Sequence, residues 1–99
     1  MTKPFIAILM GSDSDLPIMK ASAEILRGLD VPFEMKVSSA HRTPVQTHDY
    51  VKDADQRGAV AFICAAGMAA HLAGAVAANT TKPVIGVPIE SSLDGLDAL

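Results

Sequence analysis

The sequence predicts an α/β protein in which helices cover both faces of a parallel sheet. Apolar runs typical of buried strands alternate with helical segments along all 99 residues. Strands that alternate with helices at this spacing are joined by right-handed crossovers, which make the strands parallel. Each apolar run also ends in small or polar residues, as expected where such a sheet binds a ligand. A chain of this length suits one domain, so residues 1–99 are taken as a single domain.

The first unit is a strand, a polar loop and a helix. "FIAILM" (5–10) is continuously apolar, as in a strand buried on both faces. "GSDSDLP" (11–17) supplies turn residues, and Ser14 or Asp15 can cap the helix that follows. That helix ends near Gly28. Residues that fall on one face of it are Ile18, Ser22, Ile25, Leu26 and Leu29.

The second unit predicts an edge strand and a well-delimited helix. In "VPFEMKVSS" (31–39) apolar and polar residues alternate, which indicates a half-buried or edge strand. Thr43 can cap the next helix and Pro44 suits its first position. We expect this helix to run to Arg57 and to be closed by Gly58.

The last two units contain the most apolar part of the chain. "VAFICAA" (60–66) predicts a buried strand that Gly67 separates from an alanine-rich helix, and "PVIGVPIESS" (83–92) contains a fourth strand. Residues 59–78 hold only His71 as an ionisable group and are long enough to span a bilayer. Alanine and glycine dominate its second half, aromatic residues do not flank it and Gly67 interrupts it, so a buried strand and helix explain this stretch better than a membrane span.

Composition narrows the possible partners and the compartment. The formal net charge of −3, from 8 basic and 11 acidic residues, provides no basic face for nucleic acid. Hydrophobic residues make up 49% of the chain, more than a small domain needs for its own core, so we expect homo-oligomeric contacts or further chain to cover part of the surface. The single cysteine, Cys64, reads as a small buried hydrophobic residue and fits the reducing cytoplasm.

Polar residues at the carboxyl ends of the predicted strands form the candidate site. His41 directly precedes a helix and can exchange protons near neutral pH, although an exposed loop histidine would look the same. Arg42 can bind a phosphate or carboxylate, or form a surface ion pair. Position alone predicts a buried structural role for His71 and a surface position for His48. The histidines lack metal-ligand spacing.

Four motifs together resemble one family. "MGSDSD", "SSAHRTP", "AAGMAAHLAG" and "VIGVPIESS" follow the four predicted strands or lie within them, and in this order they resemble the PurE family of 5-(carboxyamino)imidazole ribonucleotide mutases in purine biosynthesis. The resemblance implies a three-layer αβα fold with a parallel, flavodoxin/Rossmann-like sheet. Family members continue beyond the position of Leu99, so we expect the C-terminal part of the family fold to be missing here. Complete members are octamers.

The resemblance also implies a reaction and its residues. An isomerase of this family moves a carboxylate from the exocyclic nitrogen of an aminoimidazole ribonucleotide to ring carbon C4, without metal or organic cofactor. The resemblance makes His41 the catalytic proton carrier. It assigns substrate binding to loop residues that would hold the phosphate and ribose, approach the carboxylate or line the same loop: Gly11, Ser12, Asp15, Ser39, Arg42, Ala66, Gly67, His71 and Leu72.

Two positions depart from the family pattern. Met68 stands where a second glycine is usual, and Ala73 where proline is frequent. Met68 adds bulk beside Gly67, which the resemblance places next to the carboxylate, so the fit of the substrate depends on it.

Other readings of the same sequence stay open. One is a related carboxylase that uses free CO2, and another is a fragment that binds the ribonucleotide without turnover. A flavin- or dinucleotide-binding domain has the least support, because residues 11–15 lack the spaced glycines of such domains.

Overall fold

The computed structural model of the chain describes residues 4–38, 44–66 and 71–89. Its centre is a four-stranded parallel sheet with the strand order β2-β1-β3-β4. The strands are β1 (Phe5–Met10), β2 (Phe33–Val37), β3 (Ala59–Ala66) and β4 (Val84–Pro88). The helices are a 3-10 turn η1 (Asp13–Asp15), α1 (Leu16–Gly28), α2 (Pro44–Arg57) and α3 (Leu72–Ala77). The predicted alternation of strands and helices is confirmed.

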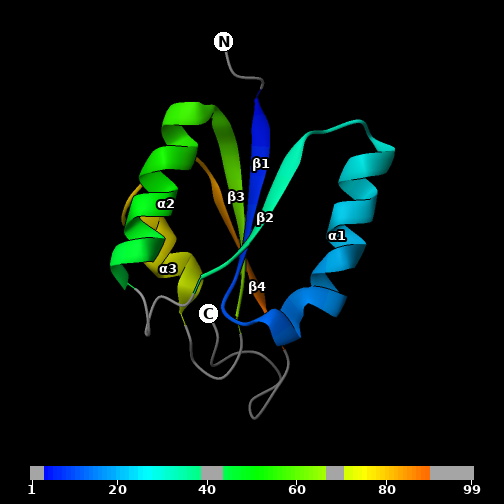
Figure 1. Cartoon of the computed structure of the whole chain (residues 1–99), viewed down its shortest axis with the longest axis horizontal. Coiled ribbons are helices and arrows are strands. Elements are labelled where there is room, and N and C mark those ends of the chain that lie inside the picture. The colour runs from blue at the N-terminus through cyan, green and yellow to red at the C-terminus, as the bar shows by residue number, and fades with distance from the viewer. Residues whose placement is uncertain (1–3, 39–43, 67–70, 90–99) are drawn as a thin grey trace.

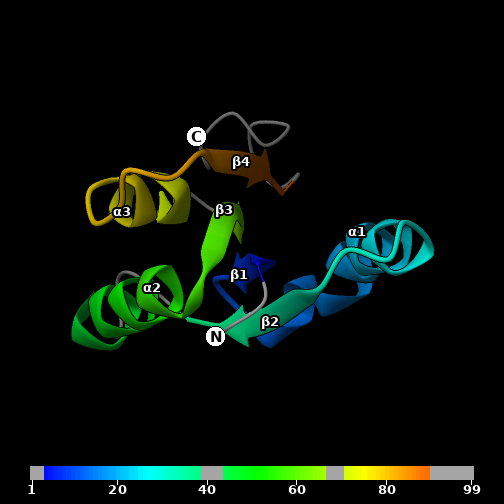
Figure 2. The ribbon, with the colours of Figure 1, turned by 90° about the horizontal axis from the view of Figure 1, so that it is seen from above.

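Helices lie on both faces of the sheet, so the described residues form three layers. Figures 1 and 2 show α1 on one side of the sheet and α2 with α3 on the other. Side chains of β1 are buried on both faces, Leu9 among residues of α2 and α3 and Ile8 against Met19 of α1. This explains why residues 5–10 are continuously apolar. β2 lies at an edge of the sheet, as its alternating pattern predicts.

The entry into α1 differs from the predicted cap in one respect. Asp15 occupies the N-cap position, but its side chain makes no capping hydrogen bond. The hydroxyl of Ser12 instead accepts a hydrogen bond from the backbone N–H of Ser14 at 3.2 Å and caps the preceding 3-10 turn. The carboxylate of Asp15 is therefore not used for capping.

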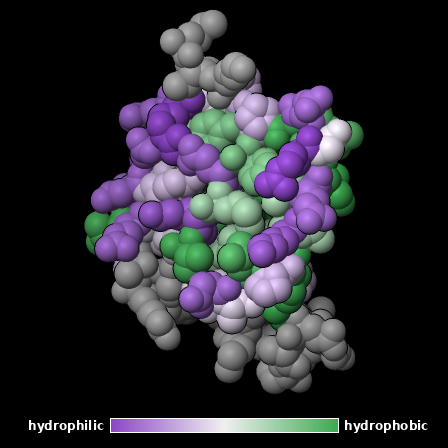
Figure 3. Space-filling view, turned by 45° about the vertical axis from the view of Figure 1, so that its right-hand side comes forward, coloured by the Kyte–Doolittle hydropathy of each residue, from purple (hydrophilic) through white to green (hydrophobic). Residues whose placement is uncertain are grey.

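The face of α1 that packs on the sheet coincides only in part with the one singled out by periodicity, since Leu26 packs against the core but other residues of that face do not. Met19 and Ala23 are its buried residues. Ile18, Ile25 and Leu29 are 52%, 64% and 68% exposed. Apolar residues surround more than half of this helix, so spacing alone could not distinguish the buried face from its neighbour. Figure 3, in which the side of α1 is turned forward, shows hydrophobic side chains reaching the surface between polar ones.

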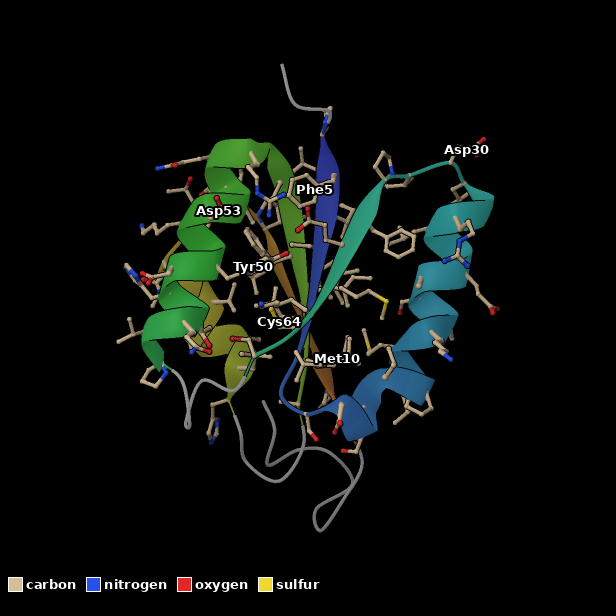
Figure 4. All side chains as sticks on the ribbon, in the orientation of Figure 1. Phe5, Met10, Asp30, Tyr50, Asp53 and Cys64 are labelled. Atoms are coloured by element: carbon tan, nitrogen blue, oxygen red, sulfur yellow. The ribbon has the colours of Figure 1, made fainter. Side chains whose placement is uncertain are left out.

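The polar face of β2 contacts α2 through Glu34, which is partly buried, while Lys36 on the same face is exposed. Glu34 accepts hydrogen bonds from the Tyr50 hydroxyl at 2.9 Å and from the Arg57 guanidinium, with which it forms an ion pair. Arg57 also donates to Asp53 at 2.7 Å. Figure 4 shows Tyr50 and Asp53 projecting from α2. The contact with Arg57 lowers the pKa of Glu34, and burial raises the pKa of Tyr50, which keeps its hydroxyl protonated.

Replacing Glu34 with Gln is expected to destabilise the fold in a pH-dependent way. The pKa of Glu34 lies below its ordinary value of 4.5, so its stabilising contribution is present above pH 4.5 and is lost as the pH falls through the lowered pKa. We expect Glu34→Gln to lower the free energy of unfolding by about 0.5 kcal/mol at pH 7, the scale of partly exposed pairs, and by less at acid pH. Urea unfolding at both pH values measures this, with Glu24→Gln on the exposed face of α1 as control. An equal loss at both pH values would rule out the ion pair as its source.

The boundaries of α2 were predicted correctly, and so was the division of the apolar residues 59–78 into a strand and a helix. α2 begins at Pro44 and ends at Arg57, and Gly58 follows with a φ of 110°, a conformation that favours glycine. The stretch from residue 59 contributes a strand, β3, and a short helix, α3. In the described ranges no helix has the length and apolar character needed to cross a membrane.

His71 and α3 correct a second prediction. His71 is exposed and adopts a left-handed conformation (φ 55°) immediately before α3, so the predicted buried histidine within that helix is wrong. The physical reason is that α3 begins one residue after His71, at Leu72. The helix is only six residues long and ends at Ala77. A Cβ added at Gly86 would lie 3.3 Å from the Ala73 Cβ, so small residues allow α3 to approach β4 closely.

Candidate functional site

Backbone hydrogen bonds bring the carboxyl ends of all four strands to one edge of the sheet. The N–H of Ser38, after β2, donates to Met10 at 2.8 Å. The N–H of Gly11, after β1, donates to the Ala65 carbonyl oxygen at 3.0 Å. The N–H of Ile89, after β4, donates to the carbonyl oxygen of Ala66, the last residue of β3, at 3.0 Å. The first residues of the predicted site loops therefore lie next to one another. In parallel α/β sheets, ligands bind at this edge.

The loop after β1 presents small and polar groups at this edge. A Cβ on Gly11 would lie 3.5 Å from the Ala66 Cβ, which places the ends of β1 and β3 in contact. The hydroxyls of Ser12 and Ser14 are exposed and lie 3.0 Å apart. Hydroxyls so placed suit an anion such as a phosphate.

Among the described site residues, Asp15 is the one that most clearly lacks a hydrogen-bond partner for its side chain. It is only 8% exposed, and its carboxylate neither caps α1 nor hydrogen-bonds to any residue in the described ranges. Burying a carboxylate without a partner costs free energy, so such a group calls for an explanation. A ligand that donates hydroxyl hydrogens at this edge would supply the missing partners.

The end of β3 and the start of α3 form the neighbouring part of the edge. Ala66 and the side chain of Leu72 are buried, and Leu72 packs in the core with Val76. Leu72 can therefore reach a ligand only through its backbone, and its binding role stays a prediction. His71 is exposed beside it and is free to face a ligand.

Several predicted site residues lie outside the described residues, and their roles stay predictions. They are Ser39, His41, Arg42 and Gly67, together with the family departure Met68. The structure does describe the flanking positions Ser38 and Pro44, which lie at the ends of β2 and α2 that face the site.

Sequence reasoning missed a buried pair of hydroxyls at this edge. The Ser38 and Thr47 hydroxyl oxygens lie 2.7 Å apart, and both residues are buried. Ser38 belongs to the polar face of β2 with Glu34 and Lys36, and that alternation was visible in the sequence. The partner on α2 was not, because it depends on how the helix lies across the strand.

Two other reactive side chains fall outside the site. Cys64 is buried in β3 among core residues on the α2 side of the sheet, and burial raises the pKa of its thiol to about 12 (Figure 4). A thiol that stays protonated near neutral pH is a poor nucleophile, so the prediction of a small buried hydrophobic residue is confirmed. His48 is exposed on α2, with Nδ1 3.3 Å from the Asp49 carboxylate, as predicted for a surface residue.

Comparison with known proteins decides the family. A family model described as AIR carboxylase matches residues 5–99. The chain belongs to this family. The PurE resemblance of its motifs is thereby confirmed, and the family extends over every strand and helix described above.

Relatives within the family carry two different names. The N5-carboxyaminoimidazole ribonucleotide mutase of Pyrococcus abyssi is 56% identical over 97 residues, which are 97% of this chain and 56% of that protein. The phosphoribosylaminoimidazole carboxylase of Saccharomyces cerevisiae is 53% identical over 100 residues, but this chain covers only 18% of it. The chain thus spans little more than half of the archaeal relative and a small part of the yeast one.

A solved structure in the family has the same fold. Treponema denticola PurE superposes with a TM-score of 0.86 at 28% sequence identity, over 96% of this chain and 61% of that one. The predicted αβα fold with a parallel, flavodoxin-like sheet is therefore confirmed.

Proposed function

We propose that this protein is an isomerase that moves a carboxylate from the exocyclic nitrogen of 5-(carboxyamino)imidazole ribonucleotide to ring carbon C4. The observation that carries the proposal is the buried carboxylate of Asp15, which has no hydrogen-bond partner among the described residues and lies at the edge where the loops after β1, β2 and β3 begin. A ribose offers the hydroxyl donors that this carboxylate lacks. The 56% identity to the Pyrococcus abyssi mutase supports the reaction class.

Each part of the substrate has a group of matching chemistry at this edge. Ser12 hydroxyl and N–H groups, completed by Ser39 and Arg42, bind the phosphate. Asp15 accepts hydrogen bonds from the ribose. The small residues that end β3 admit the carboxylate next to the backbone, where a larger side chain would intrude.

The chemistry requires only a proton carrier and an enclosed site. The bond from the exocyclic nitrogen to the carboxylate carbon breaks and releases CO2, and the nitrogen takes up a proton. The enamine-like ring then attacks CO2 through C4, forms the new carbon–carbon bond and loses the C4 proton. One proton is gained and one is lost, so a single histidine, His41, can serve both transfers. The reaction needs no oxidant, nucleotide or metal.

Turnover of two substrates tests this proposal. The chain is incubated with 5-(carboxyamino)imidazole ribonucleotide, and separately with aminoimidazole ribonucleotide and bicarbonate, while the C4-carboxylated product is followed. Conversion of the first substrate supports the mutase. Conversion of the second alone would make the protein a carboxylase that uses free CO2, and conversion of neither would leave residues 1–99 a binding fragment at most.

We also propose that the protein assembles as a homo-oligomer in the cytoplasm, an octamer as the PurE resemblance implies. Exposed apolar side chains support this, with Ile25 on α1, Leu29 directly after it and Ile85 on β4 all exposed by more than half. We expect light scattering to give a mass several times the 10.3 kDa of one chain. A mass of one chain at micromolar concentration would contradict this assembly.

A further inference from the structure

The buried hydroxyl pair of Ser38 and Thr47 lies at the edge of the sheet where β2 ends, and in the sequence it flanks residues 39–43. The two oxygens are 2.7 Å apart, and the residues are 5% and 2% exposed. Ser38 directly follows β2, and Thr47 belongs to α2. Ser38 continues β2 through its backbone hydrogen bond to Met10, and Thr47 lies in the first turn of α2. The hydrogen bond therefore connects the sheet to the helix.

This pair joins the two ends of one short segment. Residues 39–43 connect Ser38 to Pro44, and they include both His41 and Arg42. A segment whose ends are held together has fewer conformations than one with free ends. We propose that the Ser38–Thr47 hydroxyl pair is a positioning element that holds both ends of segment 39–43, so that His41 and Arg42 act on the same substrate. This inference rests on the proposed mutase function.

Hydroxyls suit this task better than apolar side chains of the same size. A buried hydroxyl is unfavourable unless it is hydrogen-bonded, so this pair is strongly driven to form. A hydrogen bond also restricts distance and angle, whereas apolar contacts allow sliding. The other end of α2 is tied to β2 by the Glu34–Arg57 ion pair. With the hydroxyl pair at its start, the helix is attached to the strand at both ends.

Matched substitutions in the full chain test the positioning role. Thr47→Val keeps the shape but removes the hydroxyl, and Thr47→Ser keeps the hydroxyl but removes a buried methyl. We expect Thr47→Val to lower kcat about tenfold, since small misplacements of catalytic groups have effects of this size or larger, with KM changed less. Thr47→Ser should stay within about twofold, because its hydrogen bond survives.

A double variant separates positioning from stability. Ser38→Ala combined with Thr47→Val removes both hydroxyls, so the Ser38 hydroxyl is not left buried without its Thr47 partner, and we expect part of the stability lost in Thr47→Val to return. Positioning predicts that kcat stays low in this double variant although its melting temperature recovers. Recovery of kcat together with the melting temperature would show a purely structural role and overturn the inference.

A second readout does not depend on turnover. Native-state trypsin cleavage after Arg42 is compared with cleavage after Arg27 at the end of α1, which serves as an internal reference. We expect Thr47→Val to increase the cleavage ratio and Thr47→Ser to leave it unchanged. If the parent chain is inactive but the ratio rises, the mutase proposal fails while the hydroxyl pair still holds the segment. An unchanged ratio, or an increased ratio with unchanged kcat in an active parent, overturns the positioning role.

Discussion

Replacing His41 with Asn is expected to abolish turnover while the ribonucleotide still binds. Asparagine keeps a polar side chain of similar reach but cannot take up and release a proton near neutral pH. Loss of general acid–base catalysis lowers rates by about 10²- to 10⁴-fold, so we expect kcat to fall by at least about a hundredfold. Affinity, measured by calorimetry, should change much less, because the proposal assigns phosphate and ribose binding to other residues.

The control for this variant is His48→Asn. His48 is exposed on the surface of α2, with its imidazole next to the Asp49 carboxylate, so its replacement should leave kcat unchanged. Turnover that survives in His41→Asn would contradict the assigned proton carrier. Loss of binding together with turnover would show that His41 holds the substrate rather than moving a proton.

Replacing Asp15 with Asn is expected to weaken ribonucleotide binding strongly without destabilising the fold. Hydrogen bonds to a charged group contribute about 1.5–3 kcal/mol, so removing the charge should raise Kd by about tenfold to a hundredfold. In the free protein, the cost of burying the carboxylate opposes its attraction to the start of α1, so these two effects of the substitution offset each other. Calorimetry and thermal unfolding of the same samples measure both quantities.

Asp13→Asn is the matched control for Asp15. Asp13 lies in the same 3-10 turn but is exposed, so its replacement should alter neither affinity nor melting temperature by much. An Asp15→Asn variant that binds as tightly as the parent would remove this carboxylate from the ribose site. A melting temperature lowered by many degrees would instead assign Asp15 a structural role.

Local signals predicted some elements well and others poorly. Pro44 at the start of α2 and Gly58 after its end are determined by backbone stereochemistry, so both ends of that helix could be predicted. The buried face of α1 could not be predicted, because Ile25 and Leu29 are as apolar as Met19. Only the packing of the helix on the sheet determines that Met19 is buried and the other two are exposed. His71 was misplaced because alanines around it suggested a longer helix than the one that begins after it.

The location of the site followed from topology, whereas its internal contacts did not. Parallel strands bring their carboxyl ends together, so the loops after β1 and β3 could be placed side by side before Gly11 was seen in contact with Ala66. The Ser38–Thr47 pair could not be foreseen, because the hydrogen bond depends on the position of α2 over β2. Such pairings are tertiary and leave no pattern in the chain.

Transfer of an isotopic label tests the central claim most directly. The protein is given 5-(carboxyamino)imidazole ribonucleotide that carries ¹³C in the transferred carboxylate, in a buffer containing unlabelled bicarbonate. The mutase account predicts a C4-carboxylated product that retains the label, because the CO2 released in the site is captured there. Formation of no product, or of a product with the isotopic composition of the buffer, would contradict it.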